Sequence, residues 1–167
     1  LDLGLKGWLG HADQFAFELG YRPAAGARRA LIGTPAVLST IGLQAAMAIW
    51  ADVDVDAAGK KHEGLSNLVR DLCDQELAEF GVSLASPRDY AARGGHIALR
   101  HPGGNALVEA LAESDVICSF RTPDSIRFGV SPLTTRYVDI WDAIERFRNV
   151  VQNEIWRDPK YSARESI

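Results

Sequence analysis

Two long helical stripes that bracket a series of short strand patterns constrain the fold most. Between residues 57 and 80, apolar side chains recur at three- and four-residue spacing, and Gly81 follows as a stop. Residues 136–156 carry a second stripe with the same periodicity. Helices of this kind must bury their apolar faces, and the short segments between them can supply the sheet that covers them.

The segments between the stripes predict two turns, one further helix and four strands. In chain order these are a strand at 82–84, a turn region at 87–94, a strand at 96–100, a helix at 105–114, and strands at 116–121 and 125–130 joined by Thr122-Pro123-Asp124. This order predicts an α+β fold, in which a small, largely antiparallel sheet carries helices on one face. We expect residues 51–167 to form this small domain.

The first 50 residues fit that layer poorly. Residues 1–33 are punctuated by glycines and predict irregular structure. A helix is expected next, with Thr34 as its N-cap and Pro35 at its first position. Residues 36–50 are apolar on nearly all sides, which predicts a buried helix. We therefore expect residues 1–50 to be the end of a neighbouring domain, with the start of a helix that runs between domains.

Composition excludes several classes of function. The formal net charge of −4 gives no support for a nucleic-acid partner. The apolar stretch 35–51 is too short and too polar for a membrane span, and no signal peptide opens the chain. No set of His, Cys, Asp or Glu has metal-ligand spacing. Two cysteines without paired spacing, Cys73 and Cys118, fit a reducing compartment, so we expect a cytoplasmic protein.

Two motifs in the first 35 residues could bind an anion. Gly33 allows close backbone approach next to the Thr34 hydroxyl at a helix start, where free N–H groups and the helix dipole favour negative charge. Trp8, between Gly7 and Gly10, can pack its ring and donate one N–H to a phosphate oxygen. The alternatives are an N-cap that serves only its own helix and a tryptophan that fills a surface gap.

Arg127 is the candidate for binding a carboxylate. Strand alternation puts Ile126, Phe128 and Val130 on the core face, so that Arg127 points the other way. Its small neighbours along the strand leave room for a ligand, and a guanidinium fork binds a carboxylate in bidentate fashion. The alternative is a solvated strand arginine.

Taken together, these motifs resemble the kynureninase family. The segment GWLGHADQFAFE is similar to the GWFGH segment of that family, and IGTPAVLS to the stretch that opens the following helix. SPRDYAARGGHIALRHPGG and IRFGVSPLTTRYVDIWDAI resemble the small domain of the family. The resemblance runs from about Gly7 to Trp156, and the motifs near 7–11 and 126–137 are its most specific parts.

The resemblance implies a pyridoxal-phosphate (PLP) enzyme of the aspartate aminotransferase fold, fold type I. Such homodimers hydrolyse L-kynurenine to anthranilate and L-alanine in tryptophan catabolism. It further implies that Trp8, Gly33 and Thr34 help to hold the PLP phosphate across the dimer interface, and that Arg127 holds the α-carboxylate of the substrate. The chain departs from the motifs mildly, with Leu9 where phenylalanine is frequent and Thr34 where some members have asparagine.

A more serious departure is the absence of the lysine that carries PLP in this family, which lies upstream of the tryptophan motif. The four lysines of this chain are Lys6, Lys60, Lys61 and Lys160, and none matches that position. The chain also begins at Leu1 rather than methionine, a hint of a missing upstream part. We therefore expect no catalytic residue in this chain and no activity from it alone.

Two alternatives stay open at this point. The chain could come from another PLP enzyme of the same fold, such as a relative of the cysteine desulfurases, although the GWLGH segment argues against this. It could also be a non-catalytic α+β binding or regulatory module.

Overall fold

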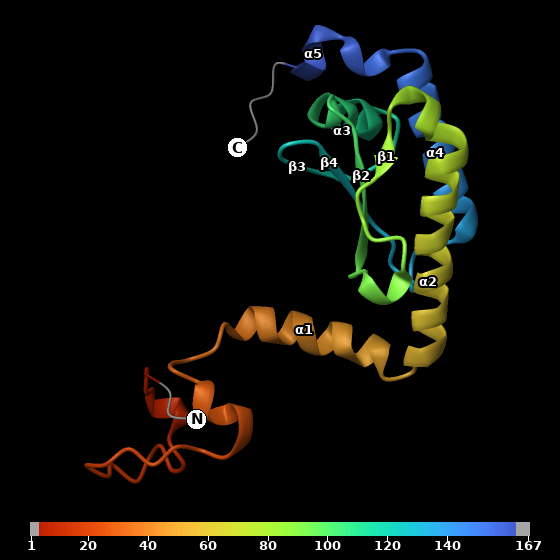
Figure 1. The fold of residues 1–167 in the computed structure, drawn as a ribbon. Helices are drawn as coiled ribbons and strands as arrows, with labels where there is room; N and C mark the ends of the chain where they lie inside the picture. The colour runs from red at the N-terminus through yellow and green to blue at the C-terminus, as the bar shows by residue number, and fades with distance from the viewer. Residues whose placement is uncertain (1–3, 163–167) are drawn as a thin grey trace. The chain divides into compact units, whose positions relative to one another are not determined.

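The structure is a computed structural model that describes residues 4–162 (Figure 1). The chain divides into two compact units, Leu1–Val53 and Asp54–Ile167. Each unit is described by itself below.

The first unit is a loop-rich segment followed by one helix. Two 3-10 turns, η1 (Trp8–Gly10) and η2 (Gly26–Ala30), precede helix α1 (Val37–Trp50). Between the turns the chain folds back on itself, because His11 pairs antiparallel with Pro23. The irregular character expected for the first 33 residues is confirmed, apart from these short turns.

Helix α1 departs from the sequence-based expectation of burial. None of its residues is buried. Its exposed large apolar side chains are Val37, Leu38, Ile41, Leu43, Met47, Ile49 and Trp50. A helix that is apolar on all sides requires cover, but its periodicity does not tell which segment supplies the cover.

The second unit opens with a long helical stretch. Helix α2 (Val55–Leu72) begins where the Asp54 carboxylate accepts hydrogen bonds from the backbone N–H groups of Asp56 and Ala57, both at 3.0 Å. The helix then continues through a π-helical turn, Cys73–Leu77, and a 3-10 turn, Ala78–Phe80. Gly81, at φ 81°, ends it in the left-handed conformation that glycine adopts without strain. The predicted helix and its stop are confirmed.

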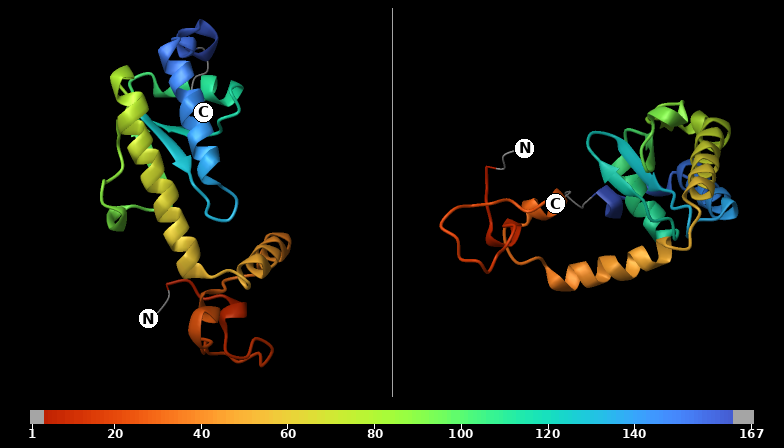
Figure 2. Two further views of the ribbon diagram at one scale, coloured as in Figure 1. Left: turned by 90° about the vertical axis from the view of Figure 1, so that its right-hand side faces the viewer. Right: turned by 90° about the horizontal axis from the view of Figure 1, so that it is seen from below.

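Four antiparallel strands form the sheet, in the order β1-β2-β4-β3. They are β1 (Ser83–Leu84), β2 (His96–Arg100), β3 (Ser119–Arg121) and β4 (Ser125–Gly129). The remaining elements are η5 (Tyr90–Ala92), α3 (Gly104–Glu113), α4 (Tyr137–Gln152), η6 (Ile155–Arg157) and α5 (Pro159–Ser162). Helices α2 and α4 run side by side (Figures 1 and 2). The predicted α+β class is confirmed.

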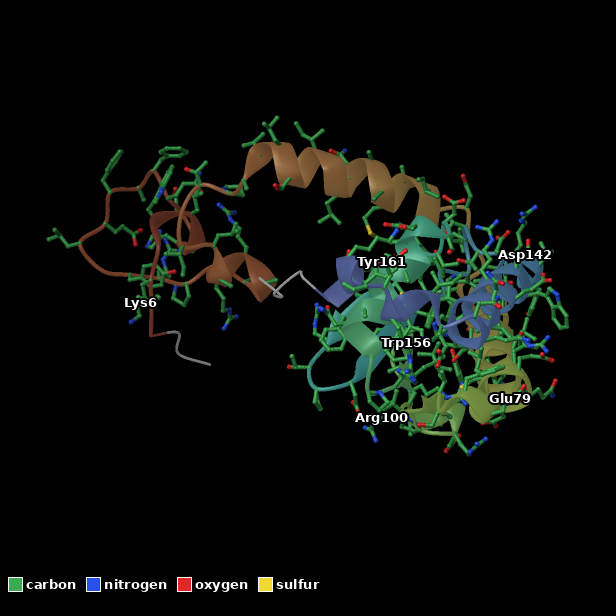
Figure 3. All side chains as sticks on the ribbon, turned by 90° about the horizontal axis from the view of Figure 1, so that it is seen from above. Lys6, Glu79, Arg100, Asp142, Trp156 and Tyr161 are labelled. Carbon is green, nitrogen blue, oxygen red and sulfur yellow. The ribbon has the colours of Figure 1, made fainter. Side chains whose placement is uncertain are left out.

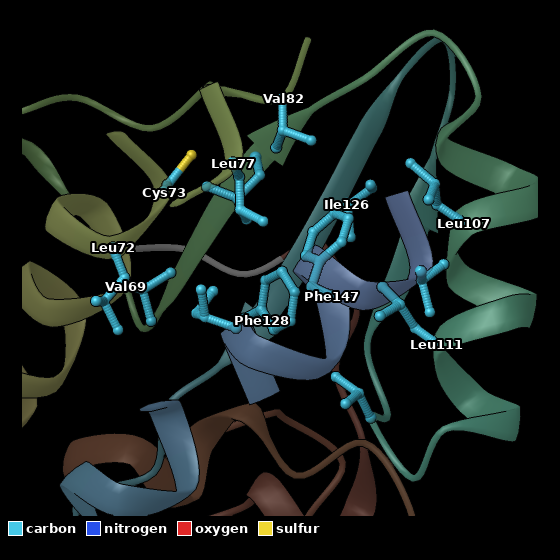
Figure 4. Packing of buried hydrophobic residues seen from close by; sticks show 14 of the residues in the cluster. Val69, Leu72, Cys73, Leu77, Val82, Leu107, Leu111, Ile126, Phe128 and Phe147 are labelled. Carbon is cyan, nitrogen blue, oxygen red and sulfur yellow. The ribbon is translucent and has the colours of Figure 1, made fainter. Parts of the chain in front are cut away.

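One face of the sheet packs against helices α2, α3 and α4 to form the core (Figure 4). Phe147 of α4 is fully buried, and its ring lies 6.2 Å from that of Phe128 on β4. Leu107 and Leu111 of α3 are also fully buried in this cluster. The core side chains of β2 and β4 lie on this face, and α2, α3 and α4 do not pack on the opposite face.

Two predicted boundaries differ from the structure. The last helix ends at Gln152 rather than 156, because Glu154 adopts a left-handed conformation with φ 51°. Strand β3 begins at Ser119 rather than 116, because the chain turns at Asp115, with φ 59°, and the Val116 N–H is bonded back to Leu111. In both places apolar residues continue the pattern past the end of the element, so composition alone could not locate the ends.

The C-terminal segment closes the core over α3 (Figure 3). The indole of Trp156 packs on Gly103, where a Cβ would lie 2.4 Å from the ring, and meets the edge of His101 at 5.1 Å between centroids. The Tyr161 hydroxyl donates to a Glu113 carboxylate oxygen at 2.7 Å. These contacts tie residues 155–161 to the rest of the second unit.

The packing of α4 predicts unequal effects for one substitution at two places on that helix. Val150 is fully buried and Val138 is 49% exposed. Val150→Ala should lower the free energy of unfolding of the chain by about 2–3 kcal/mol, since it removes buried methyl groups and leaves a cavity. Val138→Ala should cost less than about 1 kcal/mol. Denaturant titration of both variants checks this, and equal losses would contradict the orientation of α4.

Candidate functional site

Arg127 lies on the open face of the sheet, as the strand alternation predicts. Its neighbours in β4, Ile126 and Phe128, are 0% and 8% exposed and belong to the core. Val130, just after the strand, is buried as expected. The guanidinium side chain is half-buried and points away from the helices.

Small residues surround Arg127 on that face. Across the ladder it pairs with Ala98 of β2 and Ser119 of β3. Along its own strand the same face carries Ser125 and Gly129, and a Cβ at Gly129 would meet nothing within 4 Å. The nearest neighbours of Arg127 in the sheet on this face therefore carry no side chain larger than that of serine.

The three arginines on this face have different partners. Arg100 is paired with Asp124 at 3.2 Å, and it reaches the surface at the edge of the unit (Figure 3). Arg121 donates to the carbonyl of Phe120 at 2.7 Å. Within residues 54–162, no carboxylate lies at ion-pair distance from Arg127. It is thus a positive charge that can accept an anionic partner.

Trp8 lies in a segment whose conformation depends on two glycines. Gly7 packs so tightly on Ile32 that a Cβ there would lie 1.8 Å from the Ile32 carbonyl oxygen. A Cβ at Gly10 would lie 2.6 Å from the carbonyl oxygen of Arg29. Only glycine permits these approaches. Trp8 directly follows Gly7 and Gly33 directly follows Ile32, so both residues flank this backbone contact.

The indole of Trp8 is accessible. Trp8 is 53% exposed, and its ring meets the edge of Phe15 at 6.2 Å. It lines a hollow of about 280 Å³ together with residues of the folded-back segment, among them His11, Asp13, Glu18 and Tyr21. A side chain in this position can present its N–H to a bound group.

The predicted capping role of Thr34 is wrong. Helix α1 begins at Val37 with Ala36 as its N-cap, and no side chain caps it. The reason is local: Ala36 is extended, with φ −68° and ψ 91°, so the helical conformation starts only at Val37. Thr34 is exposed, and its hydroxyl is not used as the cap of its own helix.

Gly33 and Thr34 are both exposed. A Cβ at Gly33 would meet nothing within 4 Å, so packing within the chain does not require a glycine there. The first-turn N–H groups of α1 lack a side-chain acceptor. Trp8, Gly33 and Thr34 belong to the first unit and Arg127 to the second.

Two of the four lysines donate side-chain hydrogen bonds, one lies near an aromatic ring and one is exposed. Lys61 donates to the Pro132 carbonyl at 2.7 Å. Lys160 donates to Glu113 at 2.7 Å, and this hydrogen bond raises the pKa of its ammonium group. Lys6 lies 5.7 Å from the centre of the Tyr21 ring (labelled in Figure 3), and Lys60 is exposed on α2.

Histidines and cysteines have mainly structural roles in this chain. His101 is buried and accepts from the Gly103 N–H at 2.9 Å, and desolvation lowers its pKa. Burial raises the pKa of Cys73 to about 11 and that of Cys118 to about 12, so both thiols stay protonated at neutral pH. Among residues 4–162, no group of His, Cys, Asp and Glu could hold a metal ion, and no helix is long and apolar enough to cross a membrane.

His11 is a residue of the first unit whose role the sequence did not indicate. It is 8% exposed, its Nδ1 accepts from the Asp13 N–H at 3.1 Å, and its ring meets the edge of Tyr21 at 5.5 Å. In the sequence, its position directly after Gly10 in the GWLGH segment was the feature that could have indicated this role. The imidazole orders the loop that lines the hollow beside Trp8.

Comparison with known proteins gives one family. A family model described as the kynureninase C-terminal domain matches residues 59–147. A kynureninase of Pseudomonas fluorescens is 33% identical over 163 residues, which are 98% of this chain and 39% of that protein. Kynureninases of Burkholderia mallei (strain SAVP1) and Burkholderia pseudomallei (strain K96243) match with the same identity and coverage. The chain therefore spans 39% of the length of these curated relatives.

The contact between Gly7 and Ile32 predicts that a single methyl group disturbs the Trp8 segment. In Gly7→Ala the added Cβ meets backbone, which cannot move aside cheaply, at a cost of about 1–3 kcal/mol. Amide exchange at Ala12 and Ala24, whose N–H groups bond to Arg22 and Gly10, should then be roughly tenfold faster or more.

Gly20→Ala is the matched control, because a Cβ there meets nothing within 4 Å. Hydrogen exchange on the two variants measures the difference. Unchanged exchange in Gly7→Ala would refute the close approach of these two backbone segments.

Proposed function

Because this chain belongs to the kynureninase family, we propose that it is the carboxyl-terminal part of a PLP-dependent hydrolase that converts L-kynurenine to anthranilate and L-alanine. In this proposal Leu1–Val53 is the end of the large cofactor-binding domain, and Asp54–Ile167 is the small domain. The enzyme would act as a cytoplasmic homodimer in tryptophan catabolism. The free thiols of Cys73 and Cys118 agree with a reducing compartment.

One observation carries the proposal beyond the family match. Arg127 has space on one side, small neighbours and no carboxylate partner within residues 54–162, whereas Arg100 on the same face is paired with Asp124. A half-buried guanidinium without an internal counter-ion is suited to an anionic ligand. An amino-acid substrate provides one in its α-carboxylate.

Arg127 would bind and orient the substrate in this proposal. A bidentate charged pair fixes the carboxylate and therefore the direction of the neighbouring Cα bonds. Such orientation decides which bond of the substrate faces the reactive groups of the enzyme. Arg127 moves no proton in this scheme, and its contribution is to binding and alignment.

Trp8, Gly33 and Thr34 would hold the phosphate of PLP, contributed to the site of the partner subunit. The accessible indole N–H, the exposed hydroxyl and the uncapped first turn of α1 are donors suited to an anion. When bound, PLP supplies the electron sink for the bond-breaking chemistry, and the protein supplies orientation and charge. The family resemblance puts the PLP-bearing lysine outside this chain.

The exposed apolar surface of α1 supports the same proposal. We infer that the remainder of the large domain, or the partner subunit, covers this helix in the complete enzyme. This cover would also fix Thr34, three residues before the start of α1.

The proposed role of Arg127 can be tested in the complete enzyme. Arg127→Ala should raise KM for L-kynurenine by roughly 10- to 100-fold, since a charge-assisted hydrogen bond is worth about 1.5–3 kcal/mol. PLP content should not change. Arg121→Ala is the matched control, because that arginine lies on the same face and bonds to a main-chain carbonyl. Steady-state kinetics and absorbance of the cofactor give both readouts.

Trp8→Phe separates the two binding roles, because it removes the indole N–H and keeps an aromatic ring. It should reduce PLP retention on dialysis, whereas Arg127→Ala should not. An unchanged KM in Arg127→Ala would overturn the proposed role of Arg127, and unchanged PLP retention in Trp8→Phe would overturn that of Trp8.

A further prediction concerns the chain of residues 1–167 by itself. Incubated with PLP and L-kynurenine, it should release no anthranilate, because its lysines are exposed, hydrogen-bonded or strongly protonated. Anthranilate fluorescence measures this directly, with a complete kynureninase as positive control. Steady anthranilate production by the purified chain would show that one of its own lysines carries the cofactor.

A further inference from the structure

Ser119 is the residue through which the sheet contacts the guanidinium of Arg127. The two residues lie directly opposite each other in the ladder of β3 and β4, and Arg127 Nε donates to Ser119 Oγ at 3.3 Å. The other cross-strand neighbour, Ala98, has no polar side-chain atom. Within residues 54–162, the Ser119 hydroxyl is the one side-chain acceptor bonded to Arg127.

The chemistry of this contact leaves the charge of Arg127 available. A guanidinium has five N–H donors in a rigid planar fork, and Ser119 occupies the donor on Nε. A hydroxyl is neutral, so it orients the fork without forming an ion pair. The two terminal nitrogens, Nη1 and Nη2, stay available to bind both oxygens of a carboxylate end-on.

Neighbouring packing fixes the position of Ser119 itself. The next residue, Phe120, pairs with Ile126 and packs against Gly104, where a Cβ would lie 3.0 Å from the ring. β3 is an edge strand, and this contact secures it against α3. Packing of Phe120 on the core side of the sheet therefore fixes the backbone at Ser119. The Ser119 hydroxyl contacts Arg127 on the opposite side.

We propose that Ser119 is a positioning residue, which holds Arg127 so that its two terminal nitrogens face the substrate carboxylate. This inference rests on the proposed function, because it assumes that Arg127 binds that carboxylate. It adds a residue that touches neither substrate nor cofactor and acts through Arg127 alone.

The experiment measures KM and kcat for L-kynurenine in the complete enzyme, together with the dissociation constant of L-alanine by calorimetry. Ser119→Ala should raise KM and the L-alanine dissociation constant about three- to tenfold, the usual effect of one hydrogen bond, with kcat within about twofold. Ser119→Thr retains the hydroxyl and should restore both values. Ser119→Asp gives Arg127 an internal counter-ion and should raise KM more than tenfold.

Ser125→Ala is the matched control, since Ser125 lies beside Arg127 on the same face and is not bonded to it. PLP content and the unfolding midpoint should stay unchanged in all four variants. If Ser119→Ala fails to fold, Ser119→Thr and Ser119→Asp still test the idea, because they should differ from each other in KM.

The outcomes distinguish this inference from the function on which it rests. If Arg127→Ala raises KM but Ser119→Ala and Ser119→Asp leave it unchanged, Ser119 does not position Arg127 and the proposed function stands. If Arg127→Ala also leaves KM unchanged, the proposed binding role of Arg127 fails first. Equal effects of Ser119→Ala and Ser125→Ala would show a general disturbance of the sheet and would overturn the inference.

Discussion

Burial of Ile126 and Phe128 against the helices forces Arg127 onto the opposite face of the sheet, and the candidate substrate site depends on this alternation. The register of β4 with β2 aligns Ile126 with Leu99 and Arg127 with Ala98, so apolar pairs face the core and small residues surround the guanidinium. A slip of one residue would bring the arginine into the core and expose both apolar side chains, at a prohibitive cost in free energy. The hydrophobic core thus determines where the charge lies, and the small neighbours determine what can reach it.

The same alternation places two further arginines on this face, and their side chains have different partners. Arg100 forms an ion pair with Asp124, whereas Arg121 donates to a neutral carbonyl and Arg127 to a neutral hydroxyl. Within residues 54–162, Arg127 is half-buried and has no carboxylate at ion-pair distance, a property that it shares with Arg93.

Sequence reasoning reached the fold class, the order of elements and the orientation of Arg127, because these follow from hydrophobic periodicity, which the core directly enforces. It failed to locate helix ends and close backbone contacts, because these depend on local backbone geometry. The start of α1 shifted past Pro35-Ala36, and the end of α4 moved to Gln152 because of the left-handed Glu154. The close contact between Gly7 and Ile32 joins segments 25 residues apart, and no periodic pattern records such a contact.

Helix α1 exposes a large apolar surface, and this exposure has a cost in free energy. Burying one large aliphatic side chain is worth about 1.5–3 kcal/mol, so a helix that exposes Val37, Leu38, Ile41 and Met47 forgoes several such contributions at once. Thr34, the proposed phosphate donor, lies three residues before α1. If it binds PLP, whatever covers the helix in the complete enzyme would also position it, and folding and cofactor binding would be coupled through this segment.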